Sequence, residues 1–377
     1  MDTDTHRCRM FFDYDQRDLC PAAQAAGVGA VLMAPLPDGL FDGAWSSAAR
    51  EKLREAREGC DKMGGAELCA LLPAGGFLIE PYGELPFAAA VAHYAAAAKE
   101  AKDQGADSVL LHRARSLLQA RAGVLGAREA GLPVYVTVEL TGEGEGLAGD
   151  GDILAAFVTL QELGVAAFGF CAAVTGIILD AVGTVAPFSR VPLIALTRDL
   201  TGELPGPETG ALFTARTARL AQLGAVWQGI LGAEGRELAC AIETLSGVRA
   251  PEAPRVDYRG EEEIWAAGEK QVFYLDGGIE FSSPIRCESD MADEIIRLEH
   301  QGEQAICIQP ETADDGYNIS LNNANLTMLP AAFLCDDEDA LDSALFYYNG
   351  RAMVDSRSII LPERLREIAA RYGAVVV

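Results

Sequence analysis

Four side chains that could do chemistry follow three apolar segments of the sequence. His112 and Arg113 lie near the end of the segment "DSVLLHRA", Glu139 lies near the end of "PVYVTVEL", and Cys171 lies in "AAFGFCAA". An imidazole can exchange a proton near neutral pH, a guanidinium can pair with a carboxylate, and a thiolate can bind a metal or act as a nucleophile. If the segments are parallel strands, their carboxyl ends share one face, and the four residues are substrate-pocket candidates there. The competing interpretation of each is a buried or solvated side chain without a ligand.

The elements that would position these residues alternate regularly. Short runs rich in Val, Ile, Leu and Phe alternate with Ala-rich helical stretches, which is typical of parallel strands buried on both faces and connected by helices. Three helices end in a glycine just before the next strand, at Gly105, Gly164 and Gly224. Eight such units predict an α/β fold, a closed (β/α)8 TIM barrel. The predicted strands cover 9–14, 27–36, 67–74, 107–114, 133–140, 166–173, 191–198 and 225–231.

A second domain is predicted after a linker at about 247–263, where two prolines and a charge cluster interrupt the pattern. The predicted boundaries are 1–250 for the barrel and 264–377 for the second domain. Five further strands at 271–279, 304–311, 329–336, 351–358 and 372–377 predict a smaller, incomplete parallel α/β domain, a half-barrel, because five strands do not close a barrel. Its apolar last strand would be an edge, which predicts a covering second copy, another subunit or further chain of a larger parent protein.

Composition excludes several classes of partner. The formal net charge of −26 would repel both a nucleic-acid backbone and an anionic membrane. The amino terminus is polar and acidic, and no uninterrupted apolar stretch is long enough to span a bilayer, so a cytoplasmic location is predicted. The nine cysteines form no CxxC pair, which argues against a disulfide framework and a zinc ribbon.

Two regions of the sequence carry a resemblance to a known family. The stretch 77–140, with "EPYGELPFAAAVAHY" and "AREAGLPVYVTVEL", resembles the homocysteine S-methyltransferase domain of cobalamin-dependent methionine synthases. The stretch 335–356, "CDDEDALDSALFYYNGRAMVDS", and the terminal "IAARYGAVVV" are similar to the pterin-binding barrel that follows it in methionine synthase. The resemblance implies a homocysteine barrel, a partial pterin-binding domain and a role in one-carbon methyl transfer.

The metal ligands of that family are not evident in this sequence. The resemblance implies a zinc ion held by one thiolate after the sixth strand and two after the eighth, which activates the homocysteine thiol. Aligned without a gap, Ala172 occupies the first ligand position; a one-residue gap would put Cys171 there. The eighth-strand turn is "GILGA" at 229–233, and Cys240 follows Leu231 by nine residues, about 13 Å along a predicted helix. No metal ligand is therefore assigned, and folate or cobalamin is expected only through a partner.

The other pocket positions implied by the resemblance are altered as well. In the first strand, "FFDYDQRD", Asp13 is retained as a pocket candidate, while Tyr14, Asp15 and Gln16 replace small residues. In the second domain the pterin-like candidates are Glu280, Cys307, Gln309, Asp336 and Asp355. Solvated or helix-capping carboxylates are the competing interpretation of Asp336 and Asp355.

Three functions remain open from the sequence. The first is a catalytically silent relative that acts as a partner or regulator, docking on a corrinoid protein or a methionine synthase. The second is an active S-methyltransferase that moves a methyl group to homocysteine or a related thiol. The third is a small-molecule binding module that uses the barrel mouth, where Arg113 could pair with a carboxylate.

Overall fold

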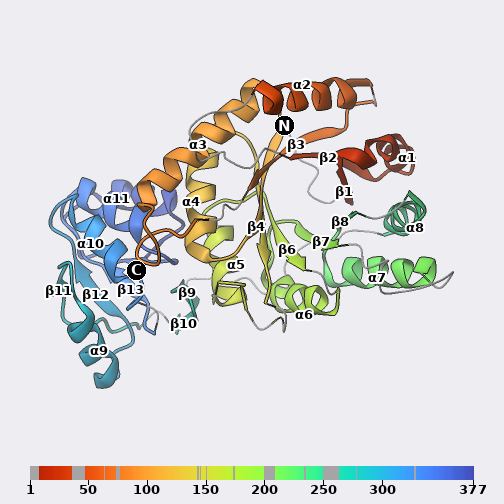
Figure 1. Cartoon of the computed structure of the whole chain (residues 1–377). Coiled ribbons are helices and arrows are strands. Elements are labelled where there is room, and N and C mark those ends of the chain that lie inside the picture. Colours follow the sequence, from red (N-terminus) through yellow and green to blue (C-terminus); the bar gives the residue numbers. More distant parts are fainter. Residues whose placement is uncertain are drawn as a thin grey trace. The chain divides into compact units, whose positions relative to one another are not determined.

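The computed structural model describes residues 8–35, 47–62, 64–73, 77–141, 144, 146–149, 151–172, 175–198, 209–232, 235–248, 263–276, 278–326 and 328–377. The chain divides into two compact units (Figure 1). The first comprises Met1–Gly75, Ala90–Gly149 and Val165–Arg255, and the second comprises Gly76–Ala89, Asp150–Gly164 and Val256–Val377. The boundaries 1–250 and 264–377 stay a prediction.

The first unit is built on a closed barrel of eight parallel strands. Each strand pairs with the next in chain order, and β1 pairs with β8 to close the barrel. Each lies within one of the eight predicted segments, so the barrel prediction is confirmed. The strands are β1 (Arg9–Asp13), β2 (Gly29–Pro35), β3 (Glu67–Pro73), β4 (Ser108–Ala114), β5 (Val134–Glu139), β6 (Ala167–Ala172), β7 (Leu193–Arg198) and β8 (Trp227–Leu231).

The connecting helices follow the expected alternation. They are α1 (Cys20–Ala25), α2 (Ser47–Lys62), α3 (Phe87–Asp103), α4 (Leu117–Arg128), α5 (Ile153–Glu162), α6 (Thr175–Val185), α7 (Thr209–Leu223) and α8 (Gly235–Ser246), with short 3-10 turns at Tyr14–Leu19 and Ala186–Phe188. Gly105, Gly164 and Gly224, after α3, α5 and α7, adopt φ values of 89°, 93° and 112°. This left-handed conformation ends a helix and favours glycine, which explains the repeated phrase in the sequence.

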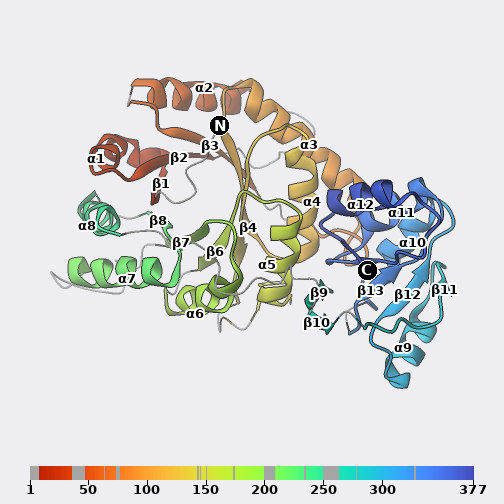
Figure 2. The same ribbon diagram turned by 180° about the vertical axis from the view of Figure 1, so that it is seen from behind.

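The second unit contains a five-stranded parallel sheet (Figure 2), and four of its strands lie within the segments predicted from the sequence. Its order is β11 (Ile285–Arg286), β12 (Ile306–Gln309), β13 (Ala331–Phe333), β14 (Met353–Val354) and β15 (Val375–Val376). The helices between these strands are α9 (Ala292–Gln301), α10 (Asp315–Asn322), α11 (Glu338–Tyr347) and α12 (Pro362–Arg371).

The first strand of that sheet differs from the prediction. The segment 271–279 does not join the parallel sheet; its strand β10 (Val272–Asp276) pairs antiparallel with β9 (Glu263–Ala267). Only a tight turn joins the two strands, and Gly268 N donates to Gln271 O there. Such a short connection permits only antiparallel pairing. The strand β9 is absent from the prediction because its first residues extend the acidic run of the linker.

The hairpin shares a core with the sheet of the second unit. Ala266, Ala305, Ala332 and Met353 form a fully buried cluster. The backbones of Ala267 and Arg351 form an antiparallel bridge. Among the described residues, no helix is long and apolar enough to cross a bilayer.

Candidate functional site

The carboxyl end of β4 carries a bulge that sets the direction of two candidate residues. Leu111 pairs with Val136 on β5, whereas Ala114 pairs with Val138, so β4 holds one extra residue. Within this bulge Arg113 has a φ of 61°, the only positive φ recorded for a non-glycine residue in the described part of the chain. A left-handed backbone is costly for a residue with a Cβ, so the surrounding contacts must hold it.

The hydroxyl of Thr137 on β5 supplies two of these contacts. Arg113 N donates to Thr137 Oγ1 at 3.2 Å, and His112 Nδ1 lies 3.1 Å from the same oxygen. Thr137 is fully buried. One buried hydroxyl therefore orients both residues at the end of β4.

Beyond the bulge, charged groups from β4, the loop after it and β5 meet. Arg113 donates a hydrogen bond from its guanidinium to Glu139 Oε1. The Nε of Arg115 lies 3.8 Å from the other carboxylate oxygen, Oε2. These three side chains are about 34%, 64% and 26% exposed for Arg113, Arg115 and Glu139, so all reach solvent. We call Arg113, Arg115, Thr137 and Glu139 the β4–β5 rim.

The backbone of Arg115 is held on both sides. Arg115 N donates to Gln119 Oε1 at 3.0 Å, and Gly149 N donates to Arg115 O at 2.6 Å. A Cβ on Gly149 would lie 2.5 Å from Arg115 O, so only glycine permits this approach. Ser116 then caps α4 by accepting from Gln119 N at 3.2 Å.

Cys171 lies beside the β4–β5 rim, whereas Asp13 lies across the barrel. Cys171 on β6 is the register partner of Glu139 and is 2% exposed. The structure thus brings His112, Arg113, Glu139 and Cys171 onto three adjacent strands. Asp13 ends β1, four strands from β5 in either direction round the closed barrel.

Asp13 is occupied by contacts to β8 and to its own turn. Its Oδ2 accepts from Gly232 N at 3.2 Å, and its N donates to Gln16 Oε1 at 2.9 Å. Gln16 Nε2 in turn donates to Ile230 O at 3.3 Å. Burial raises the pKa of the Asp13 carboxyl, and the backbone donor Gly232 partly offsets this rise.

The residues at the ends of β6 and β8 do not fit a three-thiolate zinc site. The last residues of β8 and the residue after it, Gly229–Gly232, carry no sulfur. Cys240 lies within α8, and the other cysteines of the first unit lie before β1, in α1, in α2 and inside β3. Within the described ranges, no group of three or more His, Cys, Asp or Glu side chains could hold a metal ion. Of the cysteines in the first unit, Cys171 alone lies near the carboxyl end of a barrel strand.

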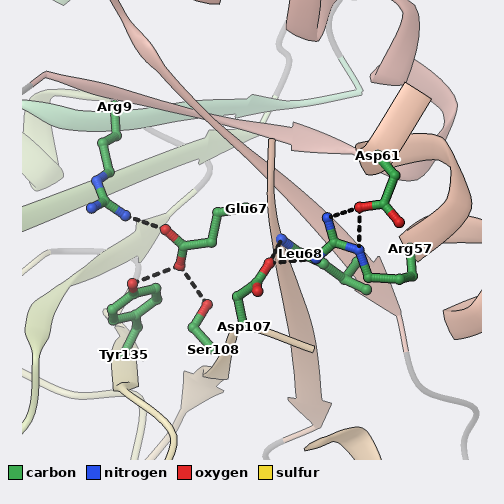
Figure 3. A network of polar contacts seen from close by, with 8 residues as sticks. All are labelled: Arg9, Arg57, Asp61, Glu67, Leu68, Asp107, Ser108 and Tyr135. Atoms are coloured by element: carbon green, nitrogen blue, oxygen red, sulfur yellow. Dashed lines mark hydrogen bonds and ion pairs between the residues drawn. The ribbon is translucent and has the colours of Figure 1, made fainter. Parts of the chain in front are cut away.

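A partly buried polar network at the opposite, amino end of the barrel was not predicted (Figure 3). Glu67 Oε1 accepts from Ser108 Oγ and from Tyr135 Oη, both at 2.6 Å, and Arg9 pairs with Glu67 Oε2. The Arg9 guanidinium also lies 4.4 Å from the ring centroid of Trp227. The sequence signal for this network is the carboxylate of Glu67 at the start of the apolar run "ELCALLP". Polar groups at this end of such a barrel serve stability, because the loops that carry activity lie at the other end.

In the second unit, three of the five pterin-like candidates lie at the carboxyl ends of the sheet strands. Gln309 ends β12, Asp336 follows β13, and Asp355 follows β14, while Cys307 is buried within β12. Glu280 lies apart from them. Its N donates to Gln304 Oε1 at 3.1 Å, before β12 begins and therefore at the amino end of the sheet.

Two of these carboxylates are engaged by the loop that follows β14. Asp355, 2% exposed, pairs with the Arg357 guanidinium, with Nε at 2.9 Å from Oδ2. Asp336 Oδ1 accepts from Ile359 N at 2.9 Å. Burial, and to a lesser degree the nearby Asp355, raises the pKa of the Cys307 thiol to about 11. The contacts of the two carboxylates hold the loop after β14 in place. The raised pKa keeps the Cys307 thiol protonated at neutral pH.

The first unit is therefore a parallel (β/α)8 barrel with charged groups at the carboxyl ends of β4 and β5. Residues 38–211 match the family model of homocysteine S-methyltransferase, over somewhat less than half of the chain. This part of the barrel is homocysteine S-methyltransferase-like. No curated protein matches the chain.

Solved barrels share only a weak likeness with this chain. The apo homocysteine methyltransferase MmuM from Escherichia coli is 12% identical, with 65% of this chain and 97% of that chain covered and a TM-score of 0.47. The 3-hexulose-6-phosphate synthase of Salmonella typhimurium is 12% identical, with 63% and 97% covered and a TM-score of 0.39. Similarities at this level carry no argument about ligand or reaction.

Proposed function

We propose that this chain is a homocysteine S-methyltransferase-like protein without zinc-dependent thiol methylation, acting as a non-catalytic partner or regulator in corrinoid or one-carbon methyl transfer. The family match over residues 38–211 supports the methyltransferase origin. The observation that carries the proposal is the position of the cysteines: of those in the first unit, only Cys171 stands at the carboxyl end of a barrel strand.

The physical reason lies in the protonation state of the substrate thiol. A free thiol has a pKa of about 8.5 and is mostly protonated at neutral pH, so it attacks a methyl donor poorly. A metal held by several thiolates would stabilise the deprotonated form. One buried cysteine does not hold zinc in this way, and the described residues beside it offer no alternative cluster.

The second unit supports a role that depends on a partner. Asp355 is paired with Arg357 and Asp336 with the backbone of Ile359, so both carboxylates already have partners. Folate or cobalamin would then enter the reaction on a corrinoid protein or a methionine synthase. The sheet edges at β11 and β15 would suit such a partner or a second copy of this chain.

Zinc content and methyl transfer together test the proposal. The protein would be expressed with added zinc, purified without chelator or affinity tag, and assayed with homocysteine and methylcobalamin. We expect zinc near background and no turnover. Near-stoichiometric zinc that is lost in Cys171→Ser and kept in Cys240→Ser, together with turnover, would instead establish an active S-methyltransferase.

The partner role needs its own measurement. Light scattering of an equimolar mixture with a purified corrinoid protein or methionine synthase should show a complex, and the complex should alter the rate of methyl transfer by that partner. This role would be contradicted if neither the corrinoid protein nor the methionine synthase formed a complex with this chain and neither changed its rate of methyl transfer in its presence.

A small-molecule binding module is the second candidate, and the β4–β5 rim favours it. The strained Arg113, held by Thr137 and facing Glu139, is an arrangement that needs no metal. Binding of a ligand at this rim is compatible with a regulatory role.

A further inference from the structure

We propose that the β4–β5 rim binds the carboxylate group of a small organic acid, which takes the place of Glu139 on the Arg113 guanidinium. This inference rests on the small-molecule candidate above and not on the partner role. It requires neither a metal nor a methyl donor.

The charge at the rim is the first argument. Among the residues that the structure describes at the rim, two guanidinium groups, from Arg113 and Arg115, face one carboxylate, from Glu139. The rim therefore keeps an excess of positive charge in a protein whose formal net charge is −26. The amino terminus of α4, which begins at Leu117, adds the positive end of a helix dipole directly after Arg115. An anion is the ligand that this charge distribution favours.

The backbone of Arg113 is the second argument. An ion pair that only stabilises the fold could be made by an arginine with an ordinary extended backbone. Arg113 is instead held at a φ of 61° within a bulge. Strained residues of this kind persist where the surroundings enforce them, and they gather at binding sites. The buried Thr137 hydroxyl enforces this one by accepting from Arg113 N.

The present partner of Arg113 indicates the class of anion. The Arg113 guanidinium already pairs with one oxygen of a carboxylate, and the planar fork of a guanidinium can bind both oxygens of a free carboxylate. Exchange would not leave Glu139 without a cation, because its other oxygen lies 3.8 Å from Arg115 Nε. A ligand carboxylate can therefore replace one contact of Glu139 while Arg115 keeps the other.

The test is a titration with succinate, with the uncharged succinamide and with inorganic phosphate. Binding is followed by the NMR shifts of the arginine Nε–Hε groups in the full chain. We expect saturable succinate binding with a Kd in the millimolar range, weaker phosphate binding, and none for succinamide. Arg113→Gly, which removes the guanidinium and tolerates the positive φ, should weaken succinate binding about tenfold or more.

Two further variants separate binding from structure. Glu139→Gln should tighten succinate binding, because the internal competitor for Arg113 loses its charge. Arg50→Ala, which removes an exposed guanidinium paired with Glu100, should leave the Kd unchanged. If Arg113→Gly does not fold, Arg113→Lys takes its place, since it keeps the charge but loses the planar fork.

Several results would overturn the inference: no saturable succinate binding, equal binding of succinamide, tighter binding of phosphate, an unchanged Kd in a folded Arg113 variant, or weaker binding in Glu139→Gln. None of these readouts depends on zinc content or on methyl transfer. The carboxylate site and the partner role can therefore fail separately.

Discussion

The phenol of Tyr135 donates a 2.6 Å hydrogen bond to Glu67 Oε1 at the amino end of the barrel. Tyr135 is 3% exposed, and its ring packs edge-on against Trp227 with centroids 5.2 Å apart. Burial, together with the neighbouring Glu67, raises the pKa of Tyr135. The phenol therefore stays a hydrogen-bond donor throughout the ordinary pH range.

Tyr135→Phe should lower the free energy of unfolding by about 1–3 kcal/mol, because Glu67 loses a buried donor. Urea unfolding at neutral pH measures the change. Tyr274→Phe is the control, since Tyr274 is 60% exposed and its ring remains. Equal losses in both variants would contradict a specific contribution of the Tyr135 hydrogen bond.

Asp13→Asn should stabilise the protein at neutral pH. Burial raises the pKa of Asp13, so the folded chain binds this proton more tightly than the unfolded chain. The stabilisation by the protonated carboxyl is fully present at pH values below the pKa of Asp13 in the unfolded chain. It is lost as the pH rises through the higher pKa of Asp13 in the folded chain. Asparagine avoids that loss and still accepts from Gly232 N.

The pH dependence of the thermal midpoint checks this prediction. The advantage of Asp13→Asn should disappear at about pH 3, below the unfolded pKa of a carboxyl group. Asp18→Asn, at an exposed position, should show no such profile. The prediction would be contradicted if Asp13→Asn were less stable than the wild-type protein at neutral pH.

One thiol should react quickly with a thiol-specific reagent in the native protein. Eight of the nine cysteines are buried, and Cys240 is the exception. Burial raises the pKa of Cys20 to about 12 and that of Cys60 to about 11, so both stay protonated at about pH 8. Cys240→Ser should abolish the fast phase, and urea should release the other eight thiols. A fast phase that survives this substitution would show that another cysteine is accessible.

Arg113→Gly should be more stable than Arg113→Ala by about 1–2 kcal/mol. Both variants lose the guanidinium, but only glycine adopts a φ of 61° without strain. Both variants lose the same side-chain contacts. The difference between their free energies of unfolding in urea therefore measures the cost of the left-handed backbone. Equal stabilities would mean that the bulge relaxes when the ion pair with Glu139 is removed.

Gly169→Ala should destabilise the barrel by about 3 kcal/mol, because the new Cβ would lie 1.8 Å from Ile194 O on the next strand. Gly183→Ala is the matched control. Gly183 lies in α6 with nothing within 4 Å of its added Cβ, so this change should raise stability by about 0.5–1 kcal/mol. Thermal unfolding of both variants gives the comparison. A well-folded Gly169→Ala protein would contradict the close pairing of β6 and β7.

The barrel was predictable because its pattern is local. Strands such as "SVLLHRA" contain consecutive buried apolar residues, and glycines such as Gly105 mark where helices stop. The same rule misassigned 271–279, since an apolar run shows that a strand forms but not which strand it pairs with. The hairpin partner β9 begins within the acidic run of the linker, and its short apolar segment "IWAA" was not predicted to be a strand.

The sequence by itself determined the order and type of the elements and the residues that end them, because hydrophobic period and helix-ending glycines act over a few neighbouring positions. Only the tertiary structure decided which side chains meet. Arg113 and Glu139 are 26 residues apart, and Glu67 and Tyr135 are 68 apart. Their pairing follows from strand register and from one bulge in β4, which depend on the packing of the whole barrel.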